Sequence, residues 1–372
     1  MPRNRVIYQS EALFVGDGTL IPTATHASGN IKQLHRVQSA NYGFSISRQN
    51  INQFGNLAKI DSIVMEAPTV NLDFTYYLHD GTNERNLGFT TGANASSAPS
   101  FISGLLDSSS VSVISGRNFH ILTVPEGSDA NTPGGTGGSN AGVNSNVISI
   151  GNGFVTNYSV EAAVGAIPTV SVGVEGLNIN VISGNAGSNP ALTIETSALG
   201  GNSFTLPNAV TGDVTVSALR PGDITLTIDD GYIADFAPAD ATNSSTAHVQ
   251  SFSIEIPIGR STLQRLGSNF GYAKVIDFPV EVTVNVSATV AELKDSGTLS
   301  AITTTDAVKN LTIQFNQAGG TSRIAYTVKG AKLVSENFSS SIGDNKTVDL
   351  VFTTQIGGPQ DTTNGVFVGV SA

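Results

Sequence analysis

The sequence predicts an all-β fold, arranged as two tandem β-sandwich domains that each carry a short flanking helix. Three observations favour this fold. The 372-residue chain contains 40 glycines and is rich in Val, Ile, Thr and Ser, a composition typical of strands joined by turns. Apolar and polar residues alternate along several segments, as they do in half-buried strands. Two segments far apart in the chain also repeat one pattern, which indicates an internal duplication.

The repeat relates residues 37–76 to residues 249–288 without a gap. Val37-Gln38-Ser39 matches Val249-Gln250-Ser251, and the same offset holds to the end of both segments. The apolar alternation also keeps its phase, because the first segment has Val70, Leu72, Phe74 and Tyr76 where the second has Val282, Val284, Val286 and Ala288. A slip of one residue would turn all these side chains to the other face of a sheet. Both copies are therefore expected to form the same half-buried strand.

A second match follows at a smaller offset. Asn157-Tyr158-Ser159 resembles Asn337-Phe338-Ser339, and Val164-Gly165 and Thr169-Val170 resemble Ile342-Gly343 and Thr347-Val348. The offset is about 180 residues, so the first copy has extra residues between the two matches. The tract from Glu126 to Asn146 is rich in Gly, Ser and Asn, and is expected to be a long exposed loop. These offsets give the first domain as residues 1–182, a linker as 183–212 and the second domain as 213–372.

Local patterns predict several smaller elements. Apolar spacing favours short helices at Ala98–Leu106 and Thr289–Lys294. The linker is expected to contain a strand at Leu192–Glu195. Asp229-Asp230-Gly231 has the composition of a tight turn, and is expected to join strands at Ile224–Ile228 and Tyr232–Phe236.

The charge content restricts the kind of partner. Only 13% of residues are charged, against about 25% in an average soluble domain. This favours either a subunit that hides its surface in an assembly or a secreted adhesive protein. The net charge of −11 disfavours nonspecific DNA binding, which needs Lys and Arg. The N-terminal residues include no apolar core of the kind found in signal peptides, so synthesis in the cytoplasm without a membrane span is expected.

Catalytic and metal chemistry are not expected. The absence of cysteine excludes disulfides and thiolate metal sites. The glycines from Gly134 to Gly138 lack the Lys-Ser/Thr of a phosphate-binding loop. An acidic group lacks the spacing of a calcium loop and favours a turn; it comprises Asp229, Asp230, Asp235 and Asp240. The histidines lack the spacing of a zinc helix; they are His26, His35, His79, His120 and His248. No enzymatic activity and no cofactor are predicted.

Arg48 and Arg260 are the candidate site residues. The repeat places them at the same position of the two copies, although basic residues are scarce in this chain. One interpretation is a solvated turn residue. The other is an ion pair between subunits, for which the planar guanidinium of arginine is suited.

Three segments of the first copy resemble the major tail tube proteins of tailed bacteriophages. They are Asn41–Gly55, Pro68–Phe74 and Asn118–Gly127. The resemblance implies β-sandwich domains with a flanking helix, whose inner sheets join around a ring into a large barrel. It also implies six such domains in a ring, so that three chains with two domains each would suffice. Rings stack into a tube through which the genome passes.

The sequence thus predicts a structural subunit of a phage tail tube, located in the virion and made in the host cytoplasm. Its partners would be copies of itself, as stacked homotrimeric rings, and other tail proteins, with DNA passing without specific binding. The lumen is expected to be acidic or neutral, and the Glu126–Asn146 loop to contact another subunit or ring. Two alternatives remain open, an extracellular adhesin or carbohydrate-binding array and another ring-forming tail component such as a terminator or baseplate hub.

Overall fold

The computed structural model confirms an all-β protein, with strands that account for most of the described residues. The structure describes these residues: 11–18, 31–93, 99–106, 116–124, 130, 145–183, 186–188, 192–193, 198–199, 203–207, 218–228, 247–267, 270–271, 273–290, 308–317, 322–343, 345–358 and 361–370.

The first half of the chain contains ten strands and the described helix α1. The elements are β1 (Glu11–Gly18), β2 (Lys32–Gln33), β3 (Val37–Ser45), β4 (Arg48–Ile51), β5 (Asp61–Val64), β6 (Thr69–Tyr77), α1 (Thr82–Leu87), a 3₁₀ helix (Phe101–Leu105), β7 (Gly116–Thr123), β8 (Asn146–Ala163), β9 (Thr169–Gly176) and β10 (Asn178–Ser183).

The region between the halves contains β11 (Ala186–Ser188), β12 (Leu192–Thr193), β13 (Ala198–Leu199) and β14 (Ser203–Thr205). The second half contains a 3₁₀ turn (Pro221–Asp223), β15 (Ile224–Ile228), β16 (Ala247–Pro257), β17 (Arg260–Leu263), β18 (Ala273–Ile276), β19 (Val280–Val290), β20 (Lys309–Asn316), β21 (Ser322–Ser339), β22 (Thr347–Ile356) and β23 (Gly365–Val370).

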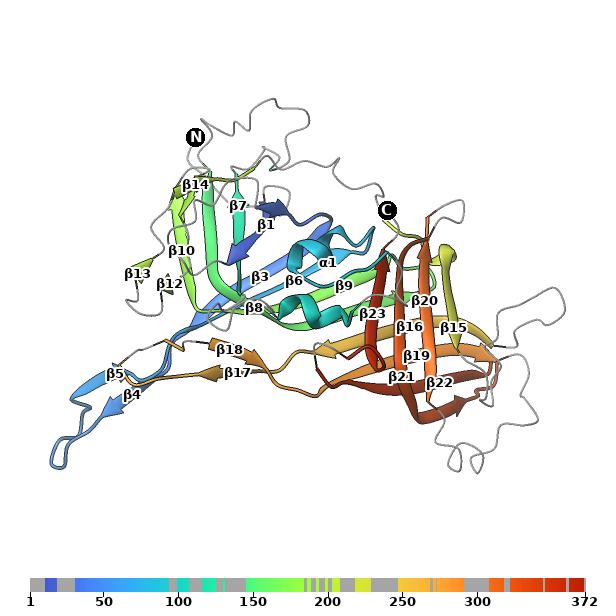
Figure 1. Cartoon of the computed structure of the whole chain (residues 1–372). Helices are drawn as coiled ribbons and strands as arrows, with labels where there is room; N and C mark the ends of the chain where they lie inside the picture. The colour runs from blue at the N-terminus through green and yellow to red at the C-terminus, as the bar shows by residue number, and fades with distance from the viewer. Residues whose placement is uncertain are drawn as a thin grey trace.

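One sheet runs through both halves in the order β3-β6-β9-β8-β16-β19-β22-β21 (Figure 1). Its first four strands and its last four repeat the same pairing, with β3, β6, β9 and β8 corresponding to β16, β19, β22 and β21. Within the chain the two sets meet where β8 pairs with β16. The repeat seen in the sequence is therefore a repeat of strand positions in one continuous sheet.

The registers of the two sets agree residue by residue. In β3 the pairing shifts between Val37 and Ser39, and in β16 it shifts between Val249 and Ser251, so the offset found in the sequence holds through a shared β-bulge. The hairpins that follow also agree, since Arg48 pairs with Val64 where Arg260 pairs with Ile276. A bulge sets the pairing register of its strand. Corresponding residues of the two copies therefore point to the same face of the sheet.

One part of the second match differs by two positions from the alignment predicted, whereas Thr169 corresponds to Thr347 as predicted. The bulge of β8 lies between Val155 and Asn157, and that of β21 lies between Leu333 and Ser335. Asn157 therefore corresponds to Ser335, and its alignment with Asn337 was wrong. A shift of two keeps the side chains on the same face, which is why the alternating pattern alone did not reveal the error.

Strands β8 and β21 are 18 residues long and each takes part in two layers (Figure 1). The first part of β8 pairs with β7 and β10, and the first part of β21 pairs with β20 and β23. Both strands change direction at a residue with positive φ, Asn152 in β8 and Gly330 in β21. These changes of direction place a second layer of strands behind one face of the eight-stranded sheet.

The core fills the space between these layers. Alternate residues of β6 and β19 are buried, and they join one hydrophobic cluster that includes side chains from both halves. Burying each such side chain contributes about 1.5–3 kcal/mol. Within the described residues, the two predicted domains therefore share one hydrophobic core. The domain boundaries given above remain predictions.

A buried polar group joins the halves inside this core. Tyr76 and Tyr158 donate hydrogen bonds to Oε1 of Glu84 at 2.8 and 3.1 Å, and the Tyr158 hydroxyl lies 2.7 Å from that of Tyr326. Because Tyr158 donates its proton to Glu84, Tyr326 is the donor to Tyr158. Burial raises the pKa of all three tyrosines well above the ordinary value, so they stay protonated donors.

The short elements differ from the expectations in part. The predicted helix at Ala98–Leu106 is the shorter 3₁₀ helix Phe101–Leu105, and β12 falls inside the predicted Leu192–Glu195 strand. The predicted helix at Thr289–Lys294 is wrong at its start, because Thr289 and Val290 end strand β19. Outside the described residues lie the rest of that segment, the Tyr232–Phe236 strand, and nearly all of the Glu126–Asn146 loop.

Substitution of Glu84 tests the polar group. Glu84→Ala leaves the buried Tyr76 and Tyr158 hydroxyls without their acceptor, and we expect it to lower the free energy of unfolding by about 3 kcal/mol. Tyr326→Phe removes one donor, and we expect a loss of about 1 kcal/mol. Urea unfolding followed by circular dichroism measures both. Equal losses would contradict the central role of the carboxylate.

Candidate assembly interface

The contact between the two halves is a strand pairing. Seven residue pairs join β8 to β16, from Ser251 opposite Ala163 to Pro257 opposite Asn157. Two further backbone hydrogen bonds extend the ladder, from the Val164 amide to the Gln250 carbonyl and from the Ile258 amide to the Thr156 carbonyl, each 2.8 Å. This junction buries one edge of each half, and backbone hydrogen bonds give it a defined register.

The β17–β18 hairpin of the second half packs on the first half beside this junction. Arg260 donates a hydrogen bond from Nε to the Val155 carbonyl at 3.0 Å, and its guanidinium lies 5.2 Å from the centre of the Phe154 ring. Lys274 forms an ion pair with Glu175. Burial lowers the pKa of Arg260 to about 10, although the Glu175 carboxylate offsets part of the fall. The half-buried guanidinium therefore joins the hairpin to the first half at this junction.

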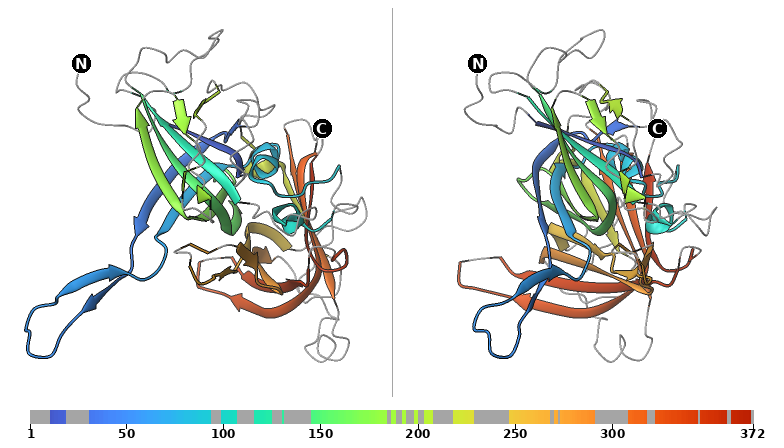
Figure 2. Two further views of the ribbon diagram at one scale, coloured as in Figure 1. Left: turned by 60° about the vertical axis from the view of Figure 1, so that its left-hand side comes forward. Right: turned by 90° about the vertical axis from the view of Figure 1, so that its left-hand side faces the viewer.

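The two predicted site residues lie in different surroundings. Arg260 contacts the other half of the same chain. Arg48 lies exposed on β4, in a hairpin that projects away from the rest of the molecule (Figure 2). Its role between subunits stays a prediction. The sequence did not reveal Lys274, Glu175 or Phe154, because Lys274 has Ser62 at the matching position and the pairing of the halves is long-range.

Both outer edges of the eight-stranded sheet are free in the chain. Within the described residues, β3 pairs with β6 alone and the C-terminal part of β21 pairs with β22 alone. Large apolar side chains are exposed on these edges, including Tyr42 and Phe44 on β3 and Val334 and Phe338 on β21. An exposed apolar edge strand is a template for pairing with another chain.

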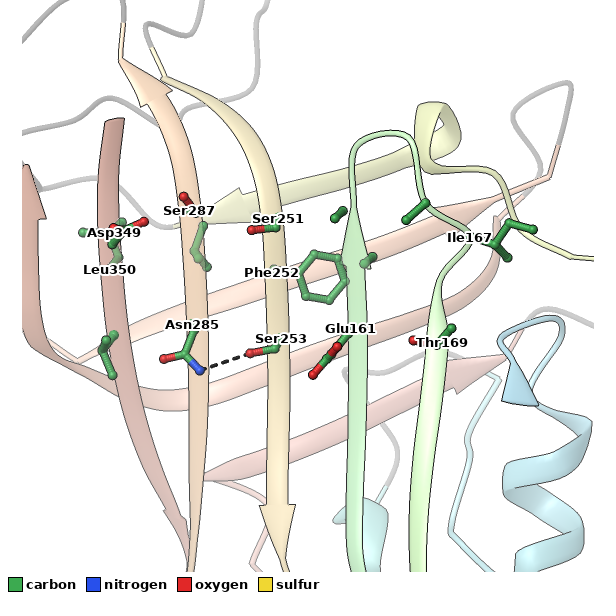
Figure 3. A pocket seen from close by; sticks show the side chains of 15 residues that line it. Glu161, Ile167, Thr169, Ser251, Phe252, Ser253, Asn285, Ser287, Asp349 and Leu350 are labelled. Atoms are coloured by element: carbon green, nitrogen blue, oxygen red, sulfur yellow. Dashed lines mark hydrogen bonds between the residues drawn. The ribbon is translucent and has the colours of Figure 1, made fainter. Parts of the chain in front are cut away.

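The face of the sheet that points away from the core is polar. Over the junction it forms an open groove of about 430 Å³ (Figure 3). Ser251, Ser253 and Glu161 line the groove, and Asn285 donates a hydrogen bond to Ser253 at 3.1 Å. Strands β6, β9, β8, β16, β19 and β22 contain no Lys or Arg. They carry six carboxylates, at Asp73, Glu161, Glu175, Glu255, Glu281 and Asp349.

The described histidines in the core make local contacts. Nδ1 of His79 lies 2.6 Å from Oδ1 of Asp80, and Nδ1 of His120 lies 2.9 Å from Oγ of Ser149. Burial raises the pKa of Asp80, but hydrogen bonds from His79 and Thr82 outweigh it and hold the pKa well below its usual range. In the described part of the chain, no group of three or more His, Asp or Glu side chains is placed to hold a metal ion.

His26 and the acidic group at Asp229, Asp230, Asp235 and Asp240 lie outside the described residues. Among the helices that the structure describes, none has the length and hydropathy of a membrane span.

No protein-family model matches the chain, and no curated protein matches it.

The two arginines provide a matched test of the junction. Arg260→Ala leaves the buried Val155 carbonyl without its donor, and we expect the free energy of unfolding of the isolated chain to fall by about 2 kcal/mol. Arg48→Ala removes an exposed side chain, and we expect a change within about 0.5 kcal/mol. Urea unfolding of dilute chains measures both. An equal effect of the two substitutions would show that Arg260 does not hold the halves together.

Proposed function

We propose that this chain is a structural subunit of a bacteriophage tail tube, in which copies close into rings and the rings stack into a conduit for the genome. The observation that carries this proposal is the repeated edge. The β8–β16 junction joins one copy to the next inside the chain, and the same two edges are free at the ends, as β3 and β21. A head-to-tail contact of this kind forms a closed ring when the rotation from each subunit to the next brings the last subunit back to the first.

Ring closure would also remove the open edges. Isolated edge strands with exposed apolar residues favour uncontrolled association, and closure of a sheet abolishes them. The resemblance to tail tube proteins implies six copies in a ring, hence three chains with pseudo-sixfold symmetry. Half of the lateral contacts then form within a chain, where the effective concentration of the partner is high.

The polar face of the sheet fits the lumen of such a tube. The second layer of strands lies behind the opposite face, and in a curved wall the thicker side belongs on the outside. The inner wall would then present the exposed carboxylates of the polar face, among them Glu161 and Asp349, while Glu175 is paired with Lys274. Basic residues bind phosphates and would hold DNA in place, so an acidic wall lets the genome slide.

Electron microscopy of the purified protein tests the proposal. We expect rings of three chains that stack into hollow tubes, with threefold symmetry on refinement and an approximate sixfold arrangement of domains. Single rings that never stack would instead favour a terminator or baseplate component. Separate monomers at high concentration, together with binding to a glycan array, would favour the adhesin alternative and contradict the proposal.

Charge reversal in the proposed lumen tests the conduit. We expect tubes with Glu161→Lys and Asp349→Lys to retain short duplex DNA at about 50 mM salt and to release it as salt rises, because lysines exchange counterions with phosphates. The control has Glu161→Gln and Asp349→Asn, which removes the negative charges without adding positive ones, and should retain none. Fluorescent DNA that co-sediments with the tubes is the readout. Retention by the unaltered tube would overturn the acidic-lumen proposal.

A further inference from the structure

We infer that β3 of one chain pairs with the C-terminal part of β21 of the next chain in the register that β16 and β8 adopt inside the chain. The shared bulges align Val37 of β3 with Val249 of β16, and Val155 of β8 with Leu333 of β21. Each residue pair of the β8–β16 junction therefore has an equivalent pair between β3 of one chain and β21 of the next. Ser45 then faces Ser335. This inference rests on the proposed function, because it specifies the lateral contact of the ring.

Differences in burial between matching residues support this pairing. Ile256 and Ile258 in the second copy are fully buried. Their counterparts in the first copy, Phe44 and Ile46, are 63% and 41% exposed. The two copies have the same fold and register, and the second copy differs in having β8 beside this strand. An equivalent strand beside β3 would bury Phe44 and Ile46 in the same way.

The opposite edge shows the complementary difference. In the junction Ile254 lies opposite Val160, and both are fully buried. The matching residues at the free edges are Tyr42 and Phe338, which are 40% and 37% exposed. The transferred register places these two aromatic side chains directly opposite each other. Cross-strand aromatic pairs stabilise antiparallel sheets. The inferred register therefore gives each of these two aromatic side chains a partner.

Hydrogen bonds to the backbone at the junction also have equivalents in the inferred contact between chains. The hydrogen bond from the Ile258 amide to the Thr156 carbonyl becomes one from Ile46 to Val334 of the next chain. The hydrogen bond from Arg260 to the Val155 carbonyl becomes one from Arg48 to the Leu333 carbonyl. This gives Arg48 a role between subunits as a donor to a backbone carbonyl, in place of the ion pair that the sequence suggested.

The charged contacts around the arginine do not transfer. Ser62 and Thr353 occupy the positions of Lys274 and Glu175, and Lys332 occupies that of Phe154. The contact between chains would therefore lack the ion pair and the aromatic ring. The backbone hydrogen bonds and the apolar side chains would hold it, and it would be weaker than the contact inside the chain.

The base and the tip of the hairpin define where this interface ends. Val64 at the base of the β4–β5 hairpin is 48% exposed, whereas its counterpart Ile276 is 6% exposed. At the tips, Phe54 and Leu266 are both fully exposed. The lateral contact therefore covers the base of each hairpin and leaves the tip uncovered.

Disulfide trapping tests the register, since the native chain has no cysteine. Gly43→Cys and Asn337→Cys introduce one pair that the inferred register places opposite each other on the polar face. The space around Gly43 admits a Cβ without contact, and Asn337 is exposed. Opposed strand residues lie within the distance that a disulfide spans. We expect oxidation of assembled rings to link most chains into covalent trimers on denaturing gels.

Two further variants provide the controls. Ser159→Cys with Glu255→Cys places the same pair in the junction inside the chain, and it should close without linking chains. Gly43→Cys with Ser339→Cys is two residues out of register, and such diagonal Cβ atoms lie about 7 Å apart, too far for an unstrained disulfide. We expect at least about a tenfold lower yield of linked chains for this pair.

The outcomes separate the inference from the function. Rings that form but link through the out-of-register pair, or through neither pair, would overturn the inferred register and leave the tube proposal standing. Unaltered chains that form no ring by electron microscopy would overturn both. Linkage of Gly43→Cys to Asn337→Cys in rings, with the internal control closed, would support the register.

Discussion

The pairing of β8 with β16 is the contact on which the rest of the structure depends. It joins two four-stranded sets into one sheet, and it uses one edge from each half. Because a sheet has two edges, one edge of each half is left without a partner in the described chain. An exposed edge strand is a template for pairing with another chain. The ring that we propose would pair these two edges.

The halves are similar in strand order, and contacts beyond the strand ladder also join them. Helix α1 and the Phe101–Leu105 turn belong to the first half, and Glu84 on α1 gathers hydroxyls from both halves. The ion pair of Lys274 with Glu175 belongs to the junction inside the chain. These groups strengthen the junction inside the chain. In the ring that we propose, the contact between chains would consist of a backbone ladder with apolar side chains.

Several features of the fold could be predicted from local patterns. The alternation from Val70 to Tyr76 identified β6 and its buried face, and the match of Val37 with Val249 located the corresponding strand and its hairpin. Within the second match, the alignment of Asn157 with Asn337 was wrong by two positions because alternation is insensitive to a shift of two, whereas the alignment of Thr169 with Thr347 agrees with the strand pairing. Helix α1 was missed because it is six residues long and is bounded by Gly81 and Gly88 in left-handed conformations, with no apolar periodicity to reveal it.

The sequence by itself determined the all-β class, the alternating faces and the repeat, because each depends on residues close together in the chain or on their identity. The tertiary structure decided which edges meet, where β8 and β21 change direction, and why Arg260 is half-buried while Arg48 is exposed. Those features depend on contacts between residues about a hundred positions apart, such as Arg260 with Val155. Local preference is the same for both arginines, and only the strand beside each one differs.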